Sequence, residues 1–234
     1  MTLTATTIAD RMADVYERIA RAAERAGRNP LSVRLIGVTK GVGLPAIREA
    51  FESGLRDVGE NRVQEALEKM ASADAWSGSD SARLAWHLVG RLQSNKVRAA
   101  VGRFDVIHSV DSLRLGQAID DAAARAGLVQ RVLIQVNVGR EPQKGGVAPE
   151  EVEPLWNTLS SCRHVRLDGL MAIPPAASDP EQMRQYFQEL RRLGCVVGAA
   201  EYSMGMSGDF EIAVEEGATM VRVGTAIFGL RVVA

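Results

Sequence analysis

Apolar residues recur at three- and four-residue intervals near the start of the chain and predict one long amphipathic helix. The repeat runs from Ile8 to Ala23, with charged residues between, and stops before Gly27 and Pro30. This spacing places one apolar stripe along a helix, and glycine and proline are common where helices end. We therefore predict a helix that packs its apolar side against the rest of the molecule.

Short apolar runs follow this helix, and each predicts a buried strand. They lie at residues 33–40, 56–60, 84–89, 104–109, 130–138, 165–173, 201–204 and 219–223. Their apolar residues are continuous rather than alternating, as is typical of parallel strands covered on both faces. Helical segments are predicted between them, over residues 44–53, 61–70, 94–101, from a cap at 111 onward, 149–160, 179–193, 210–215 and 225–228.

The alternation of strands and helices decides the fold class. Eight strand–helix units in the 234-residue chain predict an α/β protein with a single (β/α)8 TIM barrel and an extra N-terminal helix. No linker rich in Pro, Gly or Ser divides the chain, so we expect one domain over residues 1–234.

Composition narrows the classes of partner. Lys and Arg number 28 and Asp and Glu number 29, so a basic surface for nucleic acid or for a membrane is not expected. No apolar run approaches the ~20 residues that span a bilayer, and the first residues lack the pattern of a secretory leader. We expect a cytoplasmic protein in which Cys162 and Cys195 are reduced thiols. We expect no metal ion, because His108 and His164 lack partners at metal-ligand spacing.

One lysine, Lys40, closes the first predicted strand just before Gly41 and Gly43. Most such lysines end a strand at the surface, because lysine is rarely buried. In a barrel, however, active sites form at the carboxyl ends of the strands. Lys40 is therefore a candidate for a reactive amine.

The loops after the seventh and eighth predicted strands have the composition of an anion site. Ser207 and Gly208 follow one strand, and Gly224 and Thr225 follow the other. Free N–H groups between a strand and a helix bind anions, and barrels often bind phosphate in these two loops. A lysine that faces a phosphate site suggests a Schiff base, formed with either a phosphorylated sugar or pyridoxal phosphate.

Arg222 in the last predicted strand bears on that choice. A guanidinium stays protonated and has no acceptor, so beside a pyridine nitrogen it would keep that nitrogen unprotonated. The ring would then be a weak electron sink. From position alone, a salt bridge at the barrel rim is the simpler interpretation of Arg222.

Seven segments of the chain, taken in order, resemble the pyridoxal phosphate homeostasis protein family, which shares the barrel of the alanine racemase N-terminal domain. The segments lie at residues 37–40, 59–65, 86–96, 132–137, 169–174, 203–207 and 220–229. The resemblance implies a pyridoxal phosphate barrel of fold type III, in which Lys40 forms the Schiff base.

The same resemblance implies cofactor-binding roles for further residues. Asn61 would lie close to the cofactor and Arg222 would face its pyridine nitrogen, while the phosphate would be held by Ser207, Gly224 and Thr225. We add Met204 as a candidate for the ring pocket. Lys144 matches another lysine of the family, and either lies near the site or is an ordinary loop lysine.

These observations favour a protein that binds pyridoxal 5'-phosphate and takes part in its intracellular homeostasis and delivery. Pyridoxal phosphate-dependent apo-enzymes would be its partners, and we expect a monomer with no catalytic reaction and no catalytic residues.

An alternative is an amino-acid racemase or decarboxylase that uses the same cofactor. A racemase of this fold takes a tyrosine from a second β domain, and we expect none after this barrel. The three tyrosines of the chain do not end predicted strands, so a second acid–base group is hard to place. His87 could serve, but a histidine within a buried strand is more often a core residue.

A dinucleotide-binding fingerprint is a further alternative. Residues 41–46 fit the pattern G-x-G-x-x-A after a strand, and Glu60 follows at the required interval. The predicted barrel and the paired phosphate loops favour the other interpretations.

Overall fold

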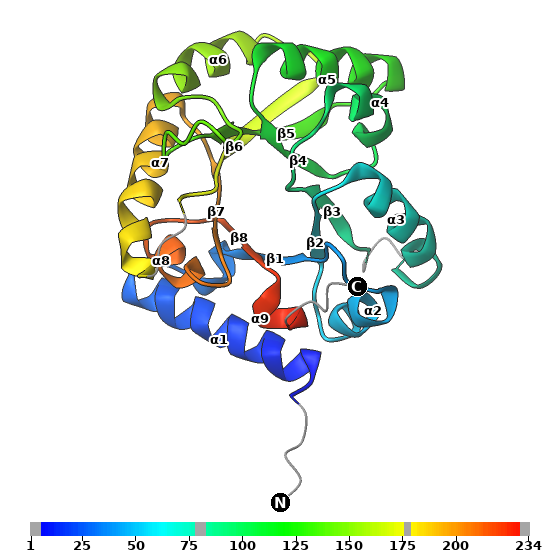
Figure 1. The fold of residues 1–234 in the computed structure, drawn as a ribbon, viewed down its shortest axis with the longest axis vertical. Coiled ribbons are helices and arrows are strands. Elements are labelled where there is room, and N and C mark those ends of the chain that lie inside the picture. The colour runs from blue at the N-terminus through cyan, green and yellow to red at the C-terminus, as the bar shows by residue number, and fades with distance from the viewer. Residues whose placement is uncertain (1–5, 78–82, 176–178, 230–234) are drawn as a thin grey trace, which may run out of the picture.

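Eight parallel strands close into a barrel in the order in which they occur along the chain, and β8 pairs with β1. The computed structural model describes residues 6–77, 83–175 and 179–229. A ring of helices surrounds the barrel (Figure 1). The predicted α/β class and (β/α)8 architecture are confirmed.

The strands are short, as the apolar runs predicted. They are β1 (Arg34–Val38), β2 (Asp57–Glu60), β3 (Ala85–Leu88), β4 (Val106–Val110), β5 (Gln130–Val136), β6 (Val165–Ala172), β7 (Glu201–Met206) and β8 (Met220–Val223). The strand at residues 33–40 ends earlier than predicted, so Thr39 and Lys40 belong to the loop after β1. One further ladder hydrogen bond, from Thr39 N to Gly59 O at 2.9 Å, still ties this loop to β2.

The helices lie on the outside of the barrel, and most of them connect successive strands. They are α1 (Ile8–Arg25), α2 (Leu44–Glu52), α3 (Val63–Ser77), α4 (Val97–Ala100), α5 (Leu113–Ala126), α6 (Val152–Leu159), α7 (Arg184–Val197), α8 (Phe210–Glu215) and α9 (Thr225–Phe228). Four short 3-10 turns occur as well, η1 (Pro30–Ser32), η2 (Ser94–Lys96), η3 (Pro149–Glu151) and η4 (Pro180–Met183). Helix α3 continues past residue 70, where the sequence pattern predicted its end.

Helix α1 precedes the first strand and covers the outside of the barrel beside β8 and β1. It begins at a capping box, in which Thr7 and Asp10 each bond the other's backbone N–H, an arrangement that satisfies donors at a helix start. Its apolar side, with Met12, Val15 and Ile19 buried, packs over α8, α9 and α2 (Figure 1). The predicted amphipathic helix is confirmed.

Two apolar regions form the core, one outside the barrel and one within it. The larger fills the space between strands and helices, whereas the inner one consists of Val106, Leu133 and Met171. TIM barrels usually fill their interior with branched aliphatic side chains. Here buried polar residues share that space with the small inner cluster, and they include His87, His108, Ser203 and Arg222.

Gly169 permits the close approach of β6 and β7. A Cβ atom on this residue would lie 1.8 Å from the carbonyl oxygen of Glu201. The backbones of β6 and β7 cannot move apart as easily as a flexible side chain could turn away. We therefore expect Gly169→Ala to lower the free energy of unfolding by more than about 3 kcal/mol. Urea denaturation measures this change.

Gly43→Ala is the matched control, because the nearest atom to its added Cβ would be Pro45 Cδ at 3.7 Å, and the φ of Gly43 is −72°. We expect it to change stability by less than about 1 kcal/mol. Equal losses in the two variants would contradict the close approach.

Candidate functional site

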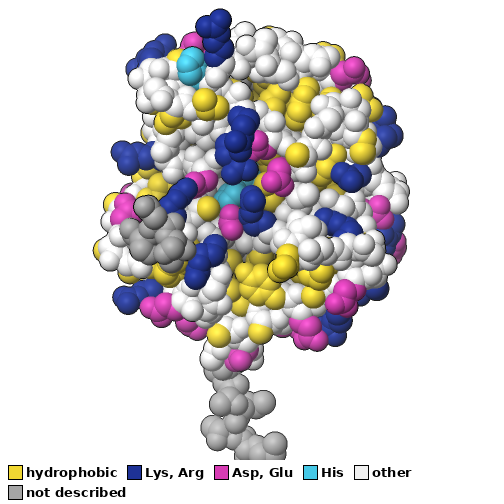
Figure 2. Space-filling view, turned by 180° about the vertical axis from the view of Figure 1, so that it is seen from behind, with side chains coloured by type: hydrophobic (Ala, Val, Ile, Leu, Met, Phe, Trp, Pro, Cys, Tyr) yellow, Lys and Arg dark blue, Asp and Glu magenta, His cyan; other side chains and the backbone are white. Residues whose placement is uncertain are grey.

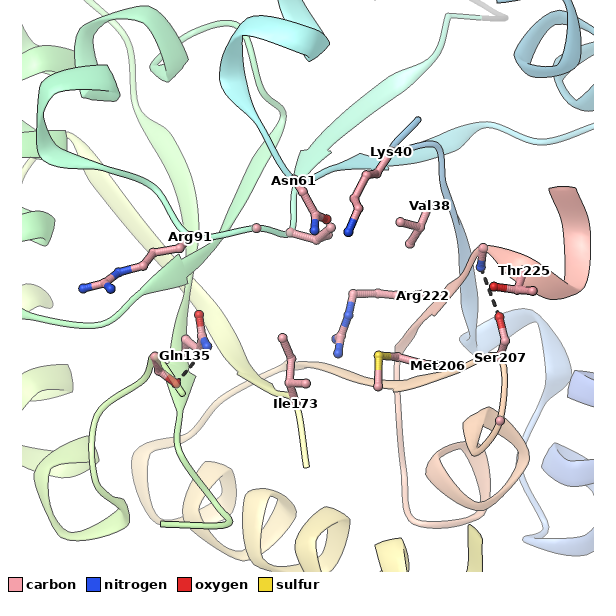
Figure 3. A pocket seen from close by; sticks show the side chains of 15 residues that line it. Val38, Lys40, Asn61, Arg91, Gln135, Ile173, Met206, Ser207, Arg222 and Thr225 are labelled. Atoms are coloured by element: carbon pink, nitrogen blue, oxygen red, sulfur yellow. Dashed lines mark hydrogen bonds between the residues drawn. The ribbon is translucent and has the colours of Figure 1, made fainter. Parts of the chain in front are cut away.

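A cavity of about 530 Å³ lies at the carboxyl ends of the strands (Figure 3). Its walls come from the loops that follow β1, β2, β3, β5, β6, β7 and β8. Six of the seven residues that the sequence proposed for the cofactor line this cavity, namely Lys40, Asn61, Ser207, Arg222, Gly224 and Thr225. The barrel therefore brings together residues that are up to 185 positions apart, from Lys40 to Thr225.

Met204 does not line the cavity, and this prediction needs correction. Its side chain is fully buried in the outer core, between the barrel and its helices. Gly205 has a φ of 87°, and the register between β7 and β8 shifts between Ser203 and Met206. The strand therefore departs from regular alternation, and Met206 lines the cavity in place of Met204.

Lys40 carries an exposed amine at one side of the cavity. Figure 3 shows its side chain beside that of Asn61, with the nitrogen directed into the cavity. Among the residues that the structure describes, no hydrogen-bond or ion-pair partner contacts the Lys40 amine. This amine is therefore free to react with a group that enters the cavity.

The loops after β7 and β8 meet on the opposite side of the cavity from Asn61 (Figure 3). The Oγ atom of Ser207 accepts from the backbone N–H groups of Gly224 at 3.2 Å and Ala226 at 3.4 Å. Asp209 Oδ1 accepts from Met206 N at 2.5 Å and so closes the turn after β7. The result is a pocket edge of N–H and hydroxyl groups without an acidic side chain in the cavity lining, which suits an anion.

Arg222 forms the floor of the cavity. Its Nη1 donates to Ser203 Oγ at 2.7 Å and its Nη2 donates to the carbonyl oxygen of Ala172 at 2.8 Å. Burial lowers the pKa of Arg222 to about 10, while the charge of Asp209 acts in the opposite direction. The guanidinium is therefore still protonated at neutral pH.

The described residues place no carboxylate within ion-pair distance of Arg222. The rim salt bridge that its sequence position suggested is thus not formed, and Arg222 is instead 4% exposed inside the barrel. Arg222 also lines the cavity, so an N–H group not used in these two bonds can donate there to a neutral acceptor such as an aromatic nitrogen.

A second polar cluster, which the sequence did not indicate, lies behind the Lys40 loop. The amine of Lys69 donates to Thr39 O, Glu60 Oε1 and Glu65 Oε1, each at 2.7 Å. Glu65 Oε1 also accepts from Gly41 N at 2.7 Å, and Thr39 Oγ1 donates to Glu60 Oε1 at 2.6 Å. These contacts fix the backbone on both sides of Lys40.

The position of Glu60 argues against a dinucleotide-binding site after β1. Its side chain is fully buried and bound to Thr39 and Lys69, so it cannot reach a ribose hydroxyl in the cavity. Burial raises the pKa of Glu60, whereas its hydrogen bonds to Lys69 and Thr39 lower it. Since the ammonium group of Lys69 lies 2.7 Å from Glu60 Oε1, we assign Glu60 as ionised opposite Lys69.

Lys144 lies on the loop after β5. Its amine donates to the carbonyl oxygen of Pro174 at 2.9 Å and forms an ion pair with Glu141. The neighbouring Gly145 lines the cavity, whereas Lys144 is not among the lining residues. The structure therefore gives Lys144 a role in joining two loops near the cavity.

The part of the chain that the structure describes contains no cluster of three His, Cys, Asp or Glu residues suited to a metal ion. In the same described part, each helix is too short or too polar to cross a membrane.

Comparison with known families matches residues 11–232 to the family model described as "Alanine racemase, N-terminal domain". Two curated relatives carry the name "Pyridoxal phosphate homeostasis protein". The one from Aquifex aeolicus (strain VF5) is 45% identical over 95% of this chain and 97% of its own length. The one from Escherichia coli (strain K12) is 38% identical over 96% of this chain and 97% of its own length.

Solved structures agree with this relationship. PipY of Synechococcus elongatus PCC7942, solved with PLP bound, is 39% identical, has a TM-score of 0.82, and matches over 95% of this chain and 100% of its own. An alanine racemase of Clostridium difficile 630 shares the fold with a TM-score of 0.70 at 15% identity, over 95% of this chain and 57% of its own.

The Lys69 cluster generates a prediction about stability. Removal of the amine in Lys69→Met leaves the carboxylate of Glu60 buried without its cation. We expect the free energy of unfolding at about pH 8 to fall by roughly 3–5 kcal/mol. The loss should shrink at about pH 5, because the pKa of Glu60 is raised by burial and protonation then removes the unpaired charge.

Urea denaturation at both pH values measures the effect, with Lys96→Met as the control. Lys96 has no ion pair among the described residues, so we expect a change within about 0.5 kcal/mol. A loss in Lys69→Met that is equally small at both pH values would contradict the assignment.

Proposed function

Since the chain belongs to the alanine racemase N-terminal domain family, and to the pyridoxal phosphate homeostasis proteins within it, we propose that it binds pyridoxal 5'-phosphate in the cavity around Lys40. Its role is then to hold this cofactor and take part in its homeostasis and delivery. One observation carries the proposal: a free amine, an anion-binding edge and a buried guanidinium surround one cavity. PLP bound to PipY, a relative of 39% identity, supports it.

The donors in the cavity fit the three functional parts of the cofactor. Backbone N–H groups and the hydroxyls of Ser207 and Thr225 suit the phosphate. Arg222 suits the ring nitrogen, and Lys40 suits the aldehyde. Apolar side chains of Val38, Ile173 and Met206 line the space between these groups, where a flat ring can lie.

Bound in this cavity, pyridoxal phosphate supplies an aldehyde that a lysine amine can hold as a Schiff base. Lys40 is the residue whose amine would hold that aldehyde carbon, with water as the other product. The amine must lose a proton before it attacks, and its exposure to solvent provides a route for that proton. The open cavity allows the same linkage to hydrolyse, which suits a protein that releases its cofactor.

Arg222 limits what the protein can do with the ring. A protonated guanidinium would donate to the ring nitrogen and would not transfer a proton to it at neutral pH. A ring with an unprotonated nitrogen withdraws electrons weakly from an attached substrate. This chemistry supports binding and transfer of the cofactor over its use in turnover.

A racemase or decarboxylase is the second candidate, because the barrel has the fold of alanine racemase. Racemisation by two bases needs a proton carrier on each side of the substrate. Among the described residues that line the cavity, the titratable side chains are Lys40, Arg91 and Arg222, and arginine is a poor proton carrier. The cavity therefore favours the binding role.

Delivery to pyridoxal phosphate-dependent apo-enzymes, a cytoplasmic location and a monomeric state complete the proposal. The exposed Lys40 and the open cavity support exchange with a partner. One chain alone supplies the amine, the anion-binding edge and the guanidinium, which supports a site that functions in a monomer.

Chemical labelling tests the position of the cofactor. Borohydride reduction of the loaded protein should fix pyridoxal phosphate to Lys40, because its amine has no competing partner among the described residues. Trypsin cannot cut after a modified lysine, so mass spectrometry should find the label on the peptide of residues 35–48. Lys144→Ala should retain this label and Lys40→Ala should lose it. A label on any other peptide would refute the assignment of Lys40.

Proton exchange separates the binding role from catalysis. We expect amino acids in deuterated water to exchange their α-proton with the loaded protein no faster than about tenfold above free pyridoxal phosphate, because the second proton carrier is missing. Nuclear magnetic resonance measures this exchange for each amino acid. An exchange rate a thousandfold above that of the free cofactor would favour the enzyme.

A further inference from the structure

A line of hydrogen bonds crosses the inside of the barrel and starts at the floor of the cavity. Arg222 Nη1 donates to Ser203 Oγ at 2.7 Å, and Ser203 Oγ lies 2.9 Å from His108 Nδ1. His108 Nε2 lies 2.9 Å from His87 Nδ1, and His87 Nε2 lies 2.9 Å from Asp57 Oδ1. We refer to these five residues as the interior chain.

The interior chain joins the two ends of the barrel. It starts in β8, passes through β7, β4 and β3, and ends at the first residue of β2. Ser203 and His108 are 0% exposed and His87 is 1% exposed, whereas the Asp57 side chain is 18% exposed. One end therefore lines the cavity, and the other reaches the surface at the amino ends of the strands.

Charged side chains gather at that surface. Figure 2 shows the face turned away in Figure 1, where Lys, Arg, Asp and Glu side chains surround a histidine near the middle. Charged residues at or near the starts of the strands include Arg34, Asp57, Arg131, Asp168 and Glu201. Arg34 lies 3.7 Å from Asp57, so the outer end of the chain is part of a mixed-charge surface.

When both imidazoles are neutral, only one arrangement of protons satisfies the interior chain. The Asp57 carboxylate can only accept, so His87 carries its proton on Nε2 and accepts on Nδ1. His108 must then donate from Nε2 and accept on Nδ1 from the hydroxyl of Ser203. Ser203 in turn accepts from Arg222, so every hydrogen bond points from the cavity towards Asp57.

This direction suits the charges at the two ends. The acceptor side of each group faces the Arg222 cation, and the donor side faces the Asp57 anion. Aligned hydrogen bonds polarise one another in a low-dielectric interior. The interior chain can thus stabilise a buried guanidinium that has no carboxylate in contact.

Other charged groups keep the middle of the interior chain neutral. Burial lowers the pKa of His108 well below its ordinary value, and the surrounding positive charges act in the same direction. The permanently charged groups that act on His108 are Arg222, Arg34 and Arg131, and a proton on His87 would act in the same direction. Arg34 and Tyr16 face Asp57 at the outer end.

We propose that His108, His87 and Asp57 are positioning residues for Arg222: they hold its guanidinium beneath the cavity and carry the influence of the Asp57 charge to the bound cofactor. The influence of Asp57 on the bound cofactor rests on the proposed function. The part of the cofactor concerned is its aromatic ring, whose nitrogen would accept a hydrogen bond from Arg222. The interior chain then tunes how strongly that ring and its linkage to Lys40 hold a proton.

Protein without cofactor tests the arrangement of protons directly. In protein labelled with ¹⁵N at histidine, long-range ¹H–¹⁵N spectra at about pH 8 should report His87 and His108 as neutral rings with the proton on Nε2. His164, the third histidine, lies outside the interior chain and provides an internal reference. A proton on Nδ1 of either ring would overturn the proposed direction.

A variant at the outer end tests the effect on the cofactor. Asp57→Asn keeps an acceptor oxygen for His87 but removes the negative charge. The nitrogen that joins Lys40 to the cofactor is positive when protonated, and the interior chain connects Asp57 with Arg222 beneath the cofactor. Loss of the Asp57 charge should therefore lower the pKa of that nitrogen. We expect the pH midpoint of the visible absorption band of bound pyridoxal phosphate to fall by roughly half a unit.

Matched variants separate this effect from a merely structural one. Asp57→Glu restores the charge and should return the midpoint to the wild-type value. Asp168→Asn removes another carboxylate at the same end of the barrel, where Asp168 pairs with Arg131 and Arg166. This variant should leave the midpoint unchanged. If Asp57 has only a structural role, Asp57→Asn should lower the free energy of unfolding without shifting the pH midpoint of the absorption band.

The outcomes distinguish this inference from the proposed function. If the wild-type protein binds no pyridoxal phosphate, the proposed function and the influence on the cofactor both fail, while the histidine spectra still decide the proton arrangement. If the cofactor binds and Asp57→Asn has the wild-type midpoint, the influence of Asp57 is refuted. Should Asp57→Asn fail to fold, the wild-type histidine spectra decide the question, because a proton on Nδ1 of either ring would break the path from Asp57 to Arg222 and refute the influence as well.

Discussion

A buried guanidinium without a carboxylate in contact is the constraint on which the interior of this barrel depends. Moving a charge out of water is costly unless hydrogen bonds replace the lost solvent. Arg222 receives such replacements from Ser203 and Ala172, and Ser203 can serve only because His108 in turn satisfies its hydroxyl. The polar residues inside the barrel therefore form one dependent series, and they leave space for only a small apolar cluster within it.

A second constraint holds the lysine that faces Arg222 across the cavity. The backbone on one side of Lys40 is tied through Thr39 to Glu60 and Lys69, and on the other through Gly41 to Glu65. The side chain of Lys40 itself is exposed. A fixed backbone with a free amine sets where the amine can reach while leaving it available to solvent, which suits a linkage that must form and hydrolyse again.

The sequence was sufficient for the architecture and for most of the cavity because both follow from local patterns. Continuous apolar runs mark covered parallel strands, and residues at the ends of such strands must meet at one end of a barrel. Met204 was misplaced because its neighbour Ser203 points into the barrel, so regular alternation turns Met204 outward. The positive φ of Gly205 then brings Met206 to the cavity, which no periodicity reveals. Apart from Glu65, which lies four residues before Lys69, the partners of Lys69 and of the two interior histidines are 9 to 95 residues away, and for these spacing along the chain carried no signal.

The fold of this protein accommodates both catalysts and binding proteins, so the cavity itself must decide between them. A protonated Arg222 beside the ring nitrogen of a bound cofactor would leave that nitrogen without a proton and would weaken the ring as an electron sink. The described lining also lacks a second proton carrier opposite Lys40. Either feature alone would slow turnover at the α-carbon of an amino acid, and together they remove both the driving force and the route for proton transfer. The residues proposed to bind the cofactor are thus the same residues that favour a role in its homeostasis over its use in turnover.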